Sequence, residues 1–279
     1  MSFETQYQSA IIVAPNGARK TQMDHPAIPI TTDEIVREVL ACRDAGAAMV
    51  HLHARTHAGV HSLEVKDNLP LYQRVKEAVG DTLVVQLTTE AVGMYQPEQQ
   101  MHLVKAVQPE AVSLALRELL PDQNSLAEGA RFFHWVAENG IIAQYILYSV
   151  DDLERYFRLI KQGVLPDYHH HLLLVLGRYQ QNQTARPEDI IPFLSCRLFE
   201  LDHRWAVCAF GQFEHNCLTT AMLMGADARV GFENNHYDNQ GTVALSNAAQ
   251  VRQLVKTSAL LNIELMSAKA FRNSFAIDQ

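Results

Sequence analysis

Short apolar runs recur along the chain, and an amphipathic stretch follows each of them. The runs are rich in β-branched residues and nearly continuous in hydrophobicity, which is typical of parallel strands buried on both faces. They cover residues 9–15, 47–54, 82–89, 110–116, 141–148, 171–177, 204–211 and 228–234. We therefore predict eight strands at these positions.

The stretches between the runs have the period and the end signals of helices. The first opens on Thr31 and acidic residues and closes on Gly46, and the second also ends on a glycine, Gly80. The eight predicted helices cover residues 31–46, 67–80, 96–109, 125–139, 150–161, 187–200, 214–224 and 246–260.

Strict alternation of eight strands and eight helices predicts a single (β/α)8 TIM barrel, an α/β fold, over residues 1–279. An open doubly wound sheet is the competing fold. Such a sheet usually carries a glycine-rich phosphate turn after its first strand, but the turn here reads "APNGARKT" and has no G-x-G-x-x-G. No internal repeat or linker indicates a second domain.

Composition and charge limit the expected partners and cellular location, and they do not change the predicted fold. The 279 residues are 48% hydrophobic and carry a net charge of -8 with no basic cluster, so nucleic acid is not an expected partner. No run reaches the ~18 apolar residues of a membrane span, and the N-terminus lacks the pattern of a signal peptide. Four cysteines without C-x-x-C spacing predict free thiols. We expect a cytoplasmic protein.

The segment "MVHLHART", residues 49–56, carries two histidines two residues apart. In a strand His51 and His53 point to the same side, because the side-chain period is two. Two imidazoles at one strand end suit a divalent metal, but such pairs also occur in cores without any function. The pair by itself leaves both interpretations open.

The barrel supplies a third ligand. Active sites of this fold lie at the carboxyl ends of the strands, and closure puts the last strand beside the first. Glu233, at the end of the last predicted strand, can then meet His51 and His53. Two histidines and one carboxylate form a catalytic zinc site with one open position. The alternative is that Glu233 pairs with Arg55 or Arg229.

Further polar residues stand at the same predicted mouth. They are Asn16, Arg19, Thr88, Glu90, Ser113, Arg229 and Asn234. Thr88 and Ser113 are equally compatible with plain strand positions. Arg117 and Glu118 are expected to begin a loop salt bridge. The triple histidine at 169–171 precedes its strand and so belongs to the stability face of the barrel, whereas His25, His57 and His61 are expected to be solvated.

Four segments carry a resemblance to a known family. "NGARKTQMDHPAIPIT", "AAMVHLHAR", "VVQLTTEAVG" and "RVGFENN" resemble the β-keto acid cleavage enzymes, and the similarity runs from about residue 11 to about residue 255. The resemblance implies a zinc-dependent TIM barrel that assembles as a homo-oligomer, a tetramer in this family. It implies a reaction in which a β-keto acid and acetyl-CoA give acetoacetate and a new acyl-CoA.

The resemblance also assigns residues. His51, His53 and Glu233 match the family's zinc ligands, and Arg229 matches an arginine that assists carbon–carbon cleavage. In the founding member of the family, substrate-binding hydroxyl residues occupy the positions of Thr88 and Ser113. A hydroxyl can orient a carboxylate without adding charge.

Two departures from the family pattern matter. Asn234 replaces an aspartate thought to accept a proton, so we nominate Glu90 as the base; Glu90 could instead cap the next helix or pair with Arg117. Arg19 falls where the founding enzyme binds an ammonium group with a glutamate. The reversed charge predicts a substrate with an anionic far end, unless Arg19 contacts coenzyme A or pairs with Asp24 on the surface. Asn16 and Asn234 complete the predicted substrate contacts.

Two other classes of function remain open. A metal-dependent hydrolase or aldolase could use the same barrel and ligands without acetyl-CoA. A binding protein could keep the metal and lack the base, and Asn234 is the feature that favours it.

Overall fold

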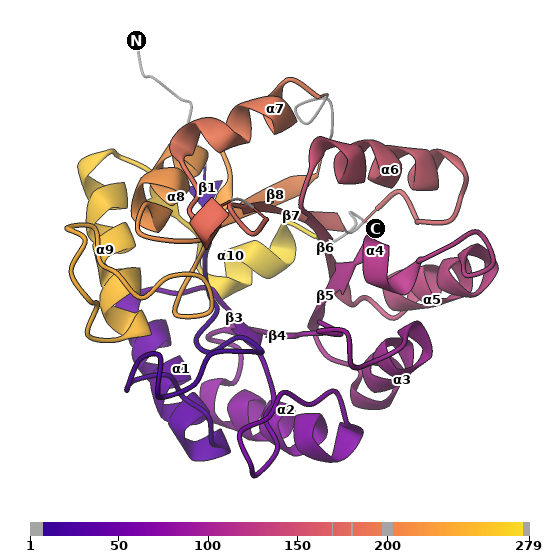
Figure 1. The fold of residues 1–279 in the computed structure, drawn as a ribbon, viewed down its shortest axis with the longest axis horizontal. Coiled ribbons are helices and arrows are strands. Elements are labelled where there is room, and N and C mark those ends of the chain that lie inside the picture. The colour runs from indigo at the N-terminus through magenta and orange to yellow at the C-terminus, as the bar shows by residue number, and fades with distance from the viewer. Residues whose placement is uncertain (1–7, 169, 180, 197–202, 276–279) are drawn as a thin grey trace.

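The closed barrel predicted from the sequence is confirmed. The computed structural model describes residues 8–168, 170–179, 181–196 and 203–275. Eight parallel strands, β2 to β9, pair in chain order, and β9 pairs back with β2 to close the ring. The helices surround it (Figure 1). The extent of the domain, residues 1–279, stays a prediction.

The strands are the hydrogen-bonded centres of the predicted apolar runs. They are β2 (Ile11–Val13), β3 (Met49–Leu52), β4 (Val84–Leu87), β5 (Ala111–Ala115), β6 (Ile142–Leu147), β7 (His170–Leu176), β8 (Arg204–Ala209) and β9 (Asp227–Val230). Most are shorter than predicted because the polar residues at their ends leave the ladder. Glu233 accordingly lies in the turn after β9 and not in the strand.

Seven of the eight predicted helices form close to their predicted bounds. They are α1 (Thr32–Ala45), α2 (Val65–Val79), α3 (Pro97–Val107), α5 (Leu126–Glu138), α6 (Val150–Lys161), α8 (Glu214–Leu223) and α9 (Asn247–Leu260). In α1 the predicted signals act as expected: Thr31 caps the helix through the amide of Glu34, and Gly46 ends it in the left-handed region at φ 112°.

The prediction of one continuous helix over 187–200 is wrong for the described residues. A 3-10 turn, η2 (Pro187–Ile190), leads into the short α7 (Ile191–Leu194), and residues 197–200 lie outside the described part of the chain. Pro187 and Pro192 each lack an amide donor, and a continuous helix tolerates such residues only in its first turn.

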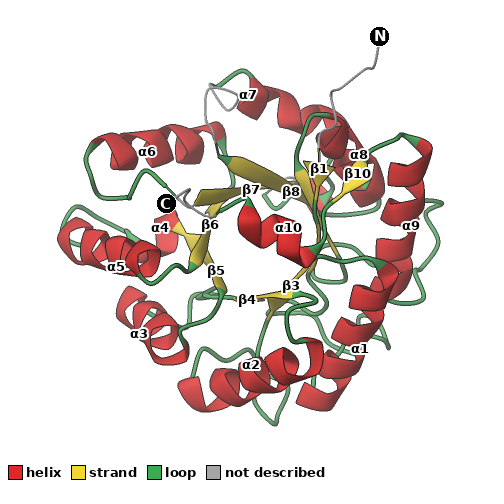
Figure 2. Ribbon diagram, turned by 180° about the vertical axis from the view of Figure 1, so that it is seen from behind, coloured by secondary structure: helices red, strands yellow, loops and turns green. Residues whose placement is uncertain are grey.

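Several short elements were not predicted. Two strands, β1 (Gln8–Ser9) and β10 (Glu264–Leu265), form a separate parallel pair. The others are α4 (Leu116–Leu119), η1 (Gln181–Gln183) and α10 (Ala268–Asn273). Figure 2 shows α10 lying across the barrel opening at the amino ends of the strands. Phe271 of α10 is fully buried against the interior apolar side chains, so this end is closed.

Each strand sends alternate side chains to the two faces of the barrel wall. In β3, Val50 and Leu52 join the core under the helices, whereas Met49 joins the interior cluster. His51 therefore shares the interior face with Met49, because side chains two residues apart point the same way. This alternation decides which polar residues can reach the interior.

The histidine tract lies at the closed end, as predicted. His170 and His171 begin β7 and are buried, and the ring of His171 contacts Phe271 and Phe275. His169 lies outside the described residues. Among the helices of the described ranges, none is both long and apolar enough to span a bilayer.

Candidate active site

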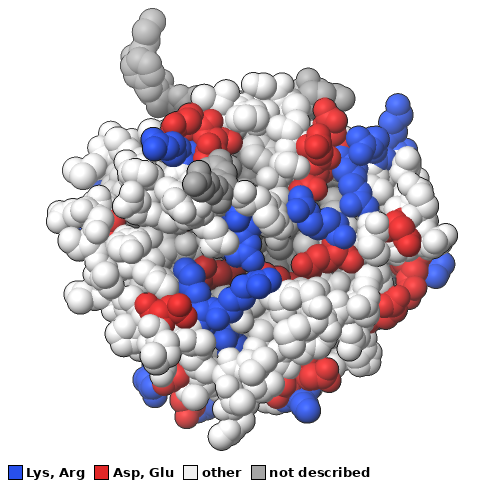
Figure 3. Space-filling view, in the orientation of Figure 1, with Lys and Arg blue, Asp and Glu red and all other residues white. Residues whose placement is uncertain are grey.

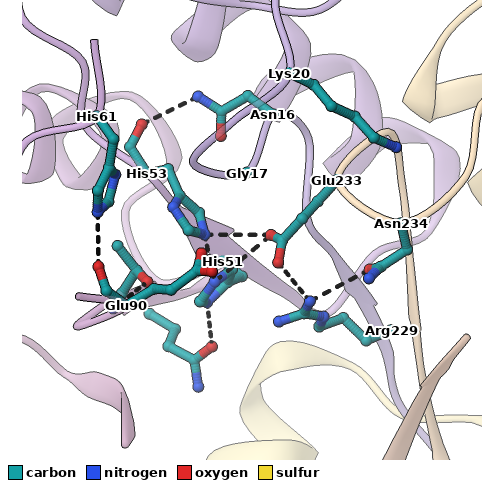
Figure 4. A network of polar contacts seen from close by, with 12 residues as sticks. Asn16, Gly17, Lys20, His51, His53, His61, Glu90, Arg229, Glu233 and Asn234 are labelled. Carbon is teal, nitrogen blue, oxygen red and sulfur yellow. Dashed lines mark hydrogen bonds and ion pairs between the residues drawn. The ribbon is translucent and has the colours of Figure 1, made fainter. Parts of the chain in front are cut away.

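His51, His53 and Glu233 converge at the open end of the barrel, as Figure 4 shows. The two Nε2 atoms lie 2.9 Å apart. Glu233 Oε2 lies 3.2 Å from His53 Nε2 and 3.7 Å from His51 Nε2. Ligand atoms that each hold zinc at about 2.1 Å in a tetrahedron stand ~3.4 Å apart. The three gaps bracket that spacing, and the described residues contain no second His, Cys, Asp or Glu group of this kind.

Two glycines let Glu233 enter this cluster. Gly231, the first residue after β9, has φ 139°, and a Cβ there would lie 2.4 Å from Ala14 O. Gly17 has φ 65°, and a Cβ there would lie 2.6 Å from Glu233 Cγ. Both positions therefore exclude larger residues on conformation and on space. The loop after β2 and the turn after β9 can approach closely only because both residues are glycine.

The two oxygens of Glu233 have different surroundings, and the predicted pairing with Arg229 is observed at one of them. Arg229 Nη2 donates to Glu233 Oε1 at 2.6 Å, whereas Oε2 faces the histidines and makes no hydrogen bond of normal geometry. Arg55 is not a partner of Glu233, because its guanidinium donates to the carbonyls of Gly17, Lys20 and Gly59. The buried, unpaired Oε2 beside two imidazole nitrogens is the arrangement that a cation would complete.

Burial and charge set the protonation of the cluster. Burial lowers the pKa of His51 to about 3, so its imidazole is neutral and one nitrogen keeps a lone pair. Burial alone would raise the pKa of Glu233, but Arg229 and the imidazoles outweigh it and hold that pKa well below its usual range. The pKa of Arg229 is raised despite its burial, chiefly because Glu233 is adjacent. His51 and Glu233 are thus in the protonation states that metal binding requires.

A cavity of about 350 Å³ opens beside the cluster. Figure 3 shows Lys and Arg side chains gathered around the hollow at the centre of this face. Its wall includes seven of the ten predicted site residues: Asn16, Arg19, His51, Thr88, Glu90, Arg229 and Glu233. The cavity is thus cationic at its rim and borders the candidate metal ligands at its base.

The other three predicted residues do not line the cavity. His53 lies behind its wall as the second histidine of the cluster. Asn234 is buried and accepts from Arg229 Nη2 at 3.3 Å, so it contacts the arginine directly. Ser113 is fully buried, and its hydroxyl has no partner among the described residues. Substrate contact by Ser113 and Asn234 stays a prediction.

Glu90 neither caps the next helix nor pairs with Arg117, the two alternatives to a role as base. Gln96 caps the following helix, α3, and Arg117 pairs with Asp152. The nearest cation to the Glu90 carboxylate is Arg178, at 3.7 Å. The predicted loop salt bridge is also wrong in its detail, because Glu118 accepts from the amide of Ala91 instead.

Sequence reasoning left several cavity residues without a role. Lys20, Tyr148, Arg178 and Tyr179 all line the cavity. Lys20 donates to Phe232 O at 2.9 Å, and burial lowers its pKa. All four lie at or just beyond the carboxyl ends of β2, β6 and β7. Their positions after the strands already indicated the barrel mouth. No local feature of the sequence, however, distinguishes a residue of the cavity wall from a solvent-exposed one.

The prediction that the three loop histidines are solvated is wrong for two of them. His25 Nε2 lies 2.8 Å from Ala244 O, and His61 Nε2 lies 2.7 Å from Glu90 O. Both side chains are buried, and burial lowers the pKa of His61 to about 3. His57 is exposed, as predicted. The loops at the barrel mouth pack on one another, which a periodicity argument cannot show.

Comparison with known proteins agrees with this barrel fold. The family model described as beta-keto acid cleavage enzyme matches residues 9–277. The chain therefore belongs to the β-keto acid cleavage enzyme family, and the resemblance seen in the sequence is confirmed.

Relatives of known activity span almost the same length. The chain is 27% identical over 253 residues to the 3-keto-5-aminohexanoate cleavage enzyme of Acetoanaerobium sticklandii, covering 88% of this chain and 90% of that protein. It is 26% identical to the 3-oxoadipate:acetyl-CoA acetyltransferase of Cupriavidus necator, covering 88% and 86%. A ternary complex of ObcA with a C4-CoA adduct and oxalate is similar in fold, with a TM-score of 0.72, 16% identity, and coverage of 90% and 68%.

Glu214 supports the turn that carries Glu233. It is the first residue of α8 and is buried. Its carboxyl oxygens accept from the amide of Gly231 at 3.3 Å and from Asn235 Nδ2 at 3.1 Å. Burial raises the pKa of Glu214 to about 8. The folded protein therefore keeps a proton that the unfolded chain releases once the pH exceeds the ordinary range of a glutamate.

This difference predicts a pH-dependent stability. Between about pH 5 and pH 8 unfolding releases the Glu214 proton, so the contribution of this carboxyl group to stability falls as pH rises. Glu214→Gln removes that loss. Denaturant titrations should show the variant gaining on the wild type by on the order of 3 kcal/mol across this window. The exposed Glu138→Gln is the control and should run parallel to the wild type. Parallel curves for Glu214→Gln would contradict the buried proton.

Proposed function

We propose that this protein is a zinc-dependent β-keto acid cleavage enzyme. It converts a β-keto acid and acetyl-CoA into acetoacetate and a new acyl-CoA. The observation that carries this proposal is the cluster of His51, His53 and Glu233 at the cavity base, with Arg229 bound to the same carboxylate. Relatives named as acetyl-CoA acetone transferase and acetyl-CoA acetyltransferase support the choice of co-substrate.

His51, His53 and Glu233 would hold the metal. When bound, zinc supplies a Lewis acid that polarises a ketone oxygen and leaves an open position for substrate. The geometry favours this fit because Nε2 of each imidazole and Oε2 of the ionised carboxylate face one buried point.

Arg229 provides a permanent cation next to that point. Its guanidinium is buried, Nη2 is shared by Glu233 and Asn234, and its Nε–H has no partner among the described residues. A buried unpaired donor on a cavity wall is available to a substrate oxygen. After the acetyl group has passed from acetyl-CoA to the carboxylate-bearing carbon, the freed coenzyme A thiolate adds to the keto carbon. The bond between the keto carbon and the carboxylate-bearing carbon then breaks, the acyl group stays on the coenzyme, and the electron pair stays on the carboxylate-bearing carbon as an enolate. A fixed guanidinium stabilises that developing charge.

Glu90 is the base in this proposal. The condensation needs a proton removed from the carbon between the ketone and the carboxylate. Only two carboxylates lie on the described wall of the cavity, Glu90 and Glu233. Glu233 is engaged with Arg229 and the histidines, whereas Glu90 has only a distant ion pair with Arg178. A carboxylate within reach of the substrate carbon meets the geometric requirement for a base.

The substrate in this proposal has an anionic far end. Arg19 is exposed at the cavity rim and makes no ion pair within the described part of the chain. Its pairing with Asp24 is wrong, since that carboxylate accepts from Thr21. A guanidinium can bind a carboxylate through two parallel hydrogen bonds. A relative named for 3-oxoadipate, a dicarboxylate, supports such a substrate. Contact of Arg19 with coenzyme A remains the competing role.

The metal site is tested by His51→Ala. The variant should lose bound zinc and acetyl-CoA-dependent turnover together, because two remaining ligands hold zinc poorly. Metal content after dialysis and initial rates with and without acetyl-CoA provide the measurement. The exposed His57→Ala should keep both. Stoichiometric zinc and full turnover in His51→Ala would place the site elsewhere, and turnover without acetyl-CoA would favour the hydrolase or aldolase class.

The base is tested by Glu90→Gln, which keeps the shape and removes the proton acceptor. The acetyl-CoA-dependent rate should fall by about 10²-fold or more, in the range that general bases contribute, while zinc content is unchanged. Glu98→Gln, an exposed glutamate of α3, is the control. A loss well below tenfold in Glu90→Gln would exclude Glu90 as the base.

Substrate charge is tested by Arg19→Glu on paired β-keto acids, one with a terminal carboxylate and one with a terminal amine. The wild type should prefer the anionic substrate, and the variant should reverse or lose that preference, mainly through KM. Arg37→Glu, on the exposed face of α1, controls for net charge. The idea is wrong if the wild type already prefers the amine. It is also wrong if the ratio is unchanged while KM for acetyl-CoA rises, the outcome expected for a coenzyme contact.

A further inference from the structure

A line of polar side chains runs through the barrel interior from the metal cluster to the closed end. His51 Nδ1 lies 2.7 Å from Gln86 Oε1. Gln86 Nε2 donates to Gln144 Oε1 at 3.3 Å, and Gln144 Nε2 lies 2.8 Å from His171 Nδ1. His171 Nε2 lies 3.0 Å from Asp227 Oδ2. We call these five residues the interior chain, and all of them are buried.

Strand register brings the interior chain together. His51 pairs with Gln86 across β3 and β4, and Gln144 pairs with His171 across β6 and β7. The step between the two glutamines crosses β5, where Ala111 is level with Gln86 and Ser113 with Gln144. These two small side chains leave room for a glutamine to reach over the intervening strand.

The charges at the closed end favour one direction for the hydrogen bonds of the interior chain. Arg204 pairs with Asp227, and the pKa of that carboxyl stays below its usual value despite burial. Asp227 can then only accept, and its negative charge favours a proton on His171 Nε2, which lies 3.0 Å from Oδ2 although the two groups are not aligned as a hydrogen bond. Burial lowers the pKa of His171, which keeps the ring neutral and makes Nδ1 an acceptor. Gln144 must therefore donate to His171 and accept from Gln86.

The same logic reaches the metal cluster. Because Gln86 spends its amide hydrogen on Gln144, its oxygen faces His51 and accepts from Nδ1. The proton of His51 is thus on Nδ1, and the Nε2 lone pair points at His53 and Glu233. Flipping both amides would require a proton on His171 Nδ1. His171 would then either carry a second proton or turn the lone pair of Nε2 toward the ionised Asp227 carboxylate, and both states are unfavourable in a buried position.

We propose that Asp227, acting through Gln86 and Gln144, fixes His51 in the tautomer that binds the metal. The three residues are positioning residues, since none of them lines the cavity. This inference rests on the proposed metal site and adds a control element at the opposite end of the barrel. Hydrogen bonds to the second nitrogen of a ligating histidine commonly set its tautomer and orientation.

Packing alone does not account for the interior chain. Apolar side chains of similar volume would fill this space without the desolvation of two amides, an imidazole and a carboxylate. His53 provides a contrast in the same cluster, because its Nδ1 has no partner among the described residues. The chain therefore acts on one of the two histidines.

The test uses Gln86→Leu and Gln144→Leu, with Gln100→Leu as a buried-glutamine control outside the interior chain. Zinc affinity is measured by competition with a chelator. Long-range ¹H–¹⁵N spectra of metal-free protein labelled in histidine report which nitrogen of His51 carries the proton, and the signal lost in His51→Gln identifies it. Thermal unfolding of each metal-free variant separates loss of fold from loss of tautomer.

The wild type should show His51 protonated on Nδ1. Both leucine variants should give mixed tautomers and a 10- to 100-fold loss of zinc affinity, and Gln100→Leu should give neither. Gln86→Glu restores an acceptor for Nδ1 and should recover the tautomer. If the leucine variants keep the wild-type tautomer and affinity, the inference is overturned.

The outcome for the metal site itself is separate. Retention of zinc by His51→Ala would refute the proposed site, and the spectra of the metal-free protein would still decide whether the interior chain controls His51. Loss of zinc in His51→Ala together with unchanged Gln86→Leu and Gln144→Leu would refute only the interior chain.

Discussion

The pairing of β9 with β2 is the contact on which the site depends. In this pairing Ile11 lies opposite Ala228 and Val13 lies opposite Val230, residues more than 200 positions apart. Closure places the turn after β9 beside the loop after β2, and so carries Glu233 to the histidines of β3. An open sheet of the same strands would leave the carboxylate at one edge and the histidines near the other.

A second constraint is the shared carboxylate. Glu233 binds Arg229 through one oxygen and faces His51 and His53 with the other. The arginine keeps the carboxylate ionised in a buried position, where an isolated charge would be strongly disfavoured. The cluster can therefore form without a cation, because Arg229 balances the charge of Glu233 through one oxygen. A cation would bind at the other oxygen.

The barrel interior is divided along its axis. Apolar side chains and α10 close the end at the amino termini of the strands, and the cavity occupies the opposite end. The interior chain passes between them through the inward faces of β3, β4, β6, β7 and β9. The ion pair of Arg229 and Glu233 at the cavity end and the ion pair of Arg204 and Asp227 at the closed end thus border the same line of amides. This arrangement connects the closed end of the barrel, which stabilises the fold, to the open end, which holds the cavity.

The sequence by itself determined the barrel, most element positions and the three candidate metal ligands. Local period and cap residues carry that information, and the identity of His51, His53 and Glu233 follows once the strands are ordered in a ring. It failed at 187–200, where prolines broke an otherwise helical pattern, and at His25 and His61, whose burial depends on loops packing over one another. Only the tertiary structure decided that Glu233 serves both Arg229 and the histidines, that Glu90 faces the cavity, and that Gln86 and Gln144 connect His51 to Asp227. These are contacts between residues far apart in the chain, set by strand register and loop packing, and a local pattern of hydrophobicity contains no record of them.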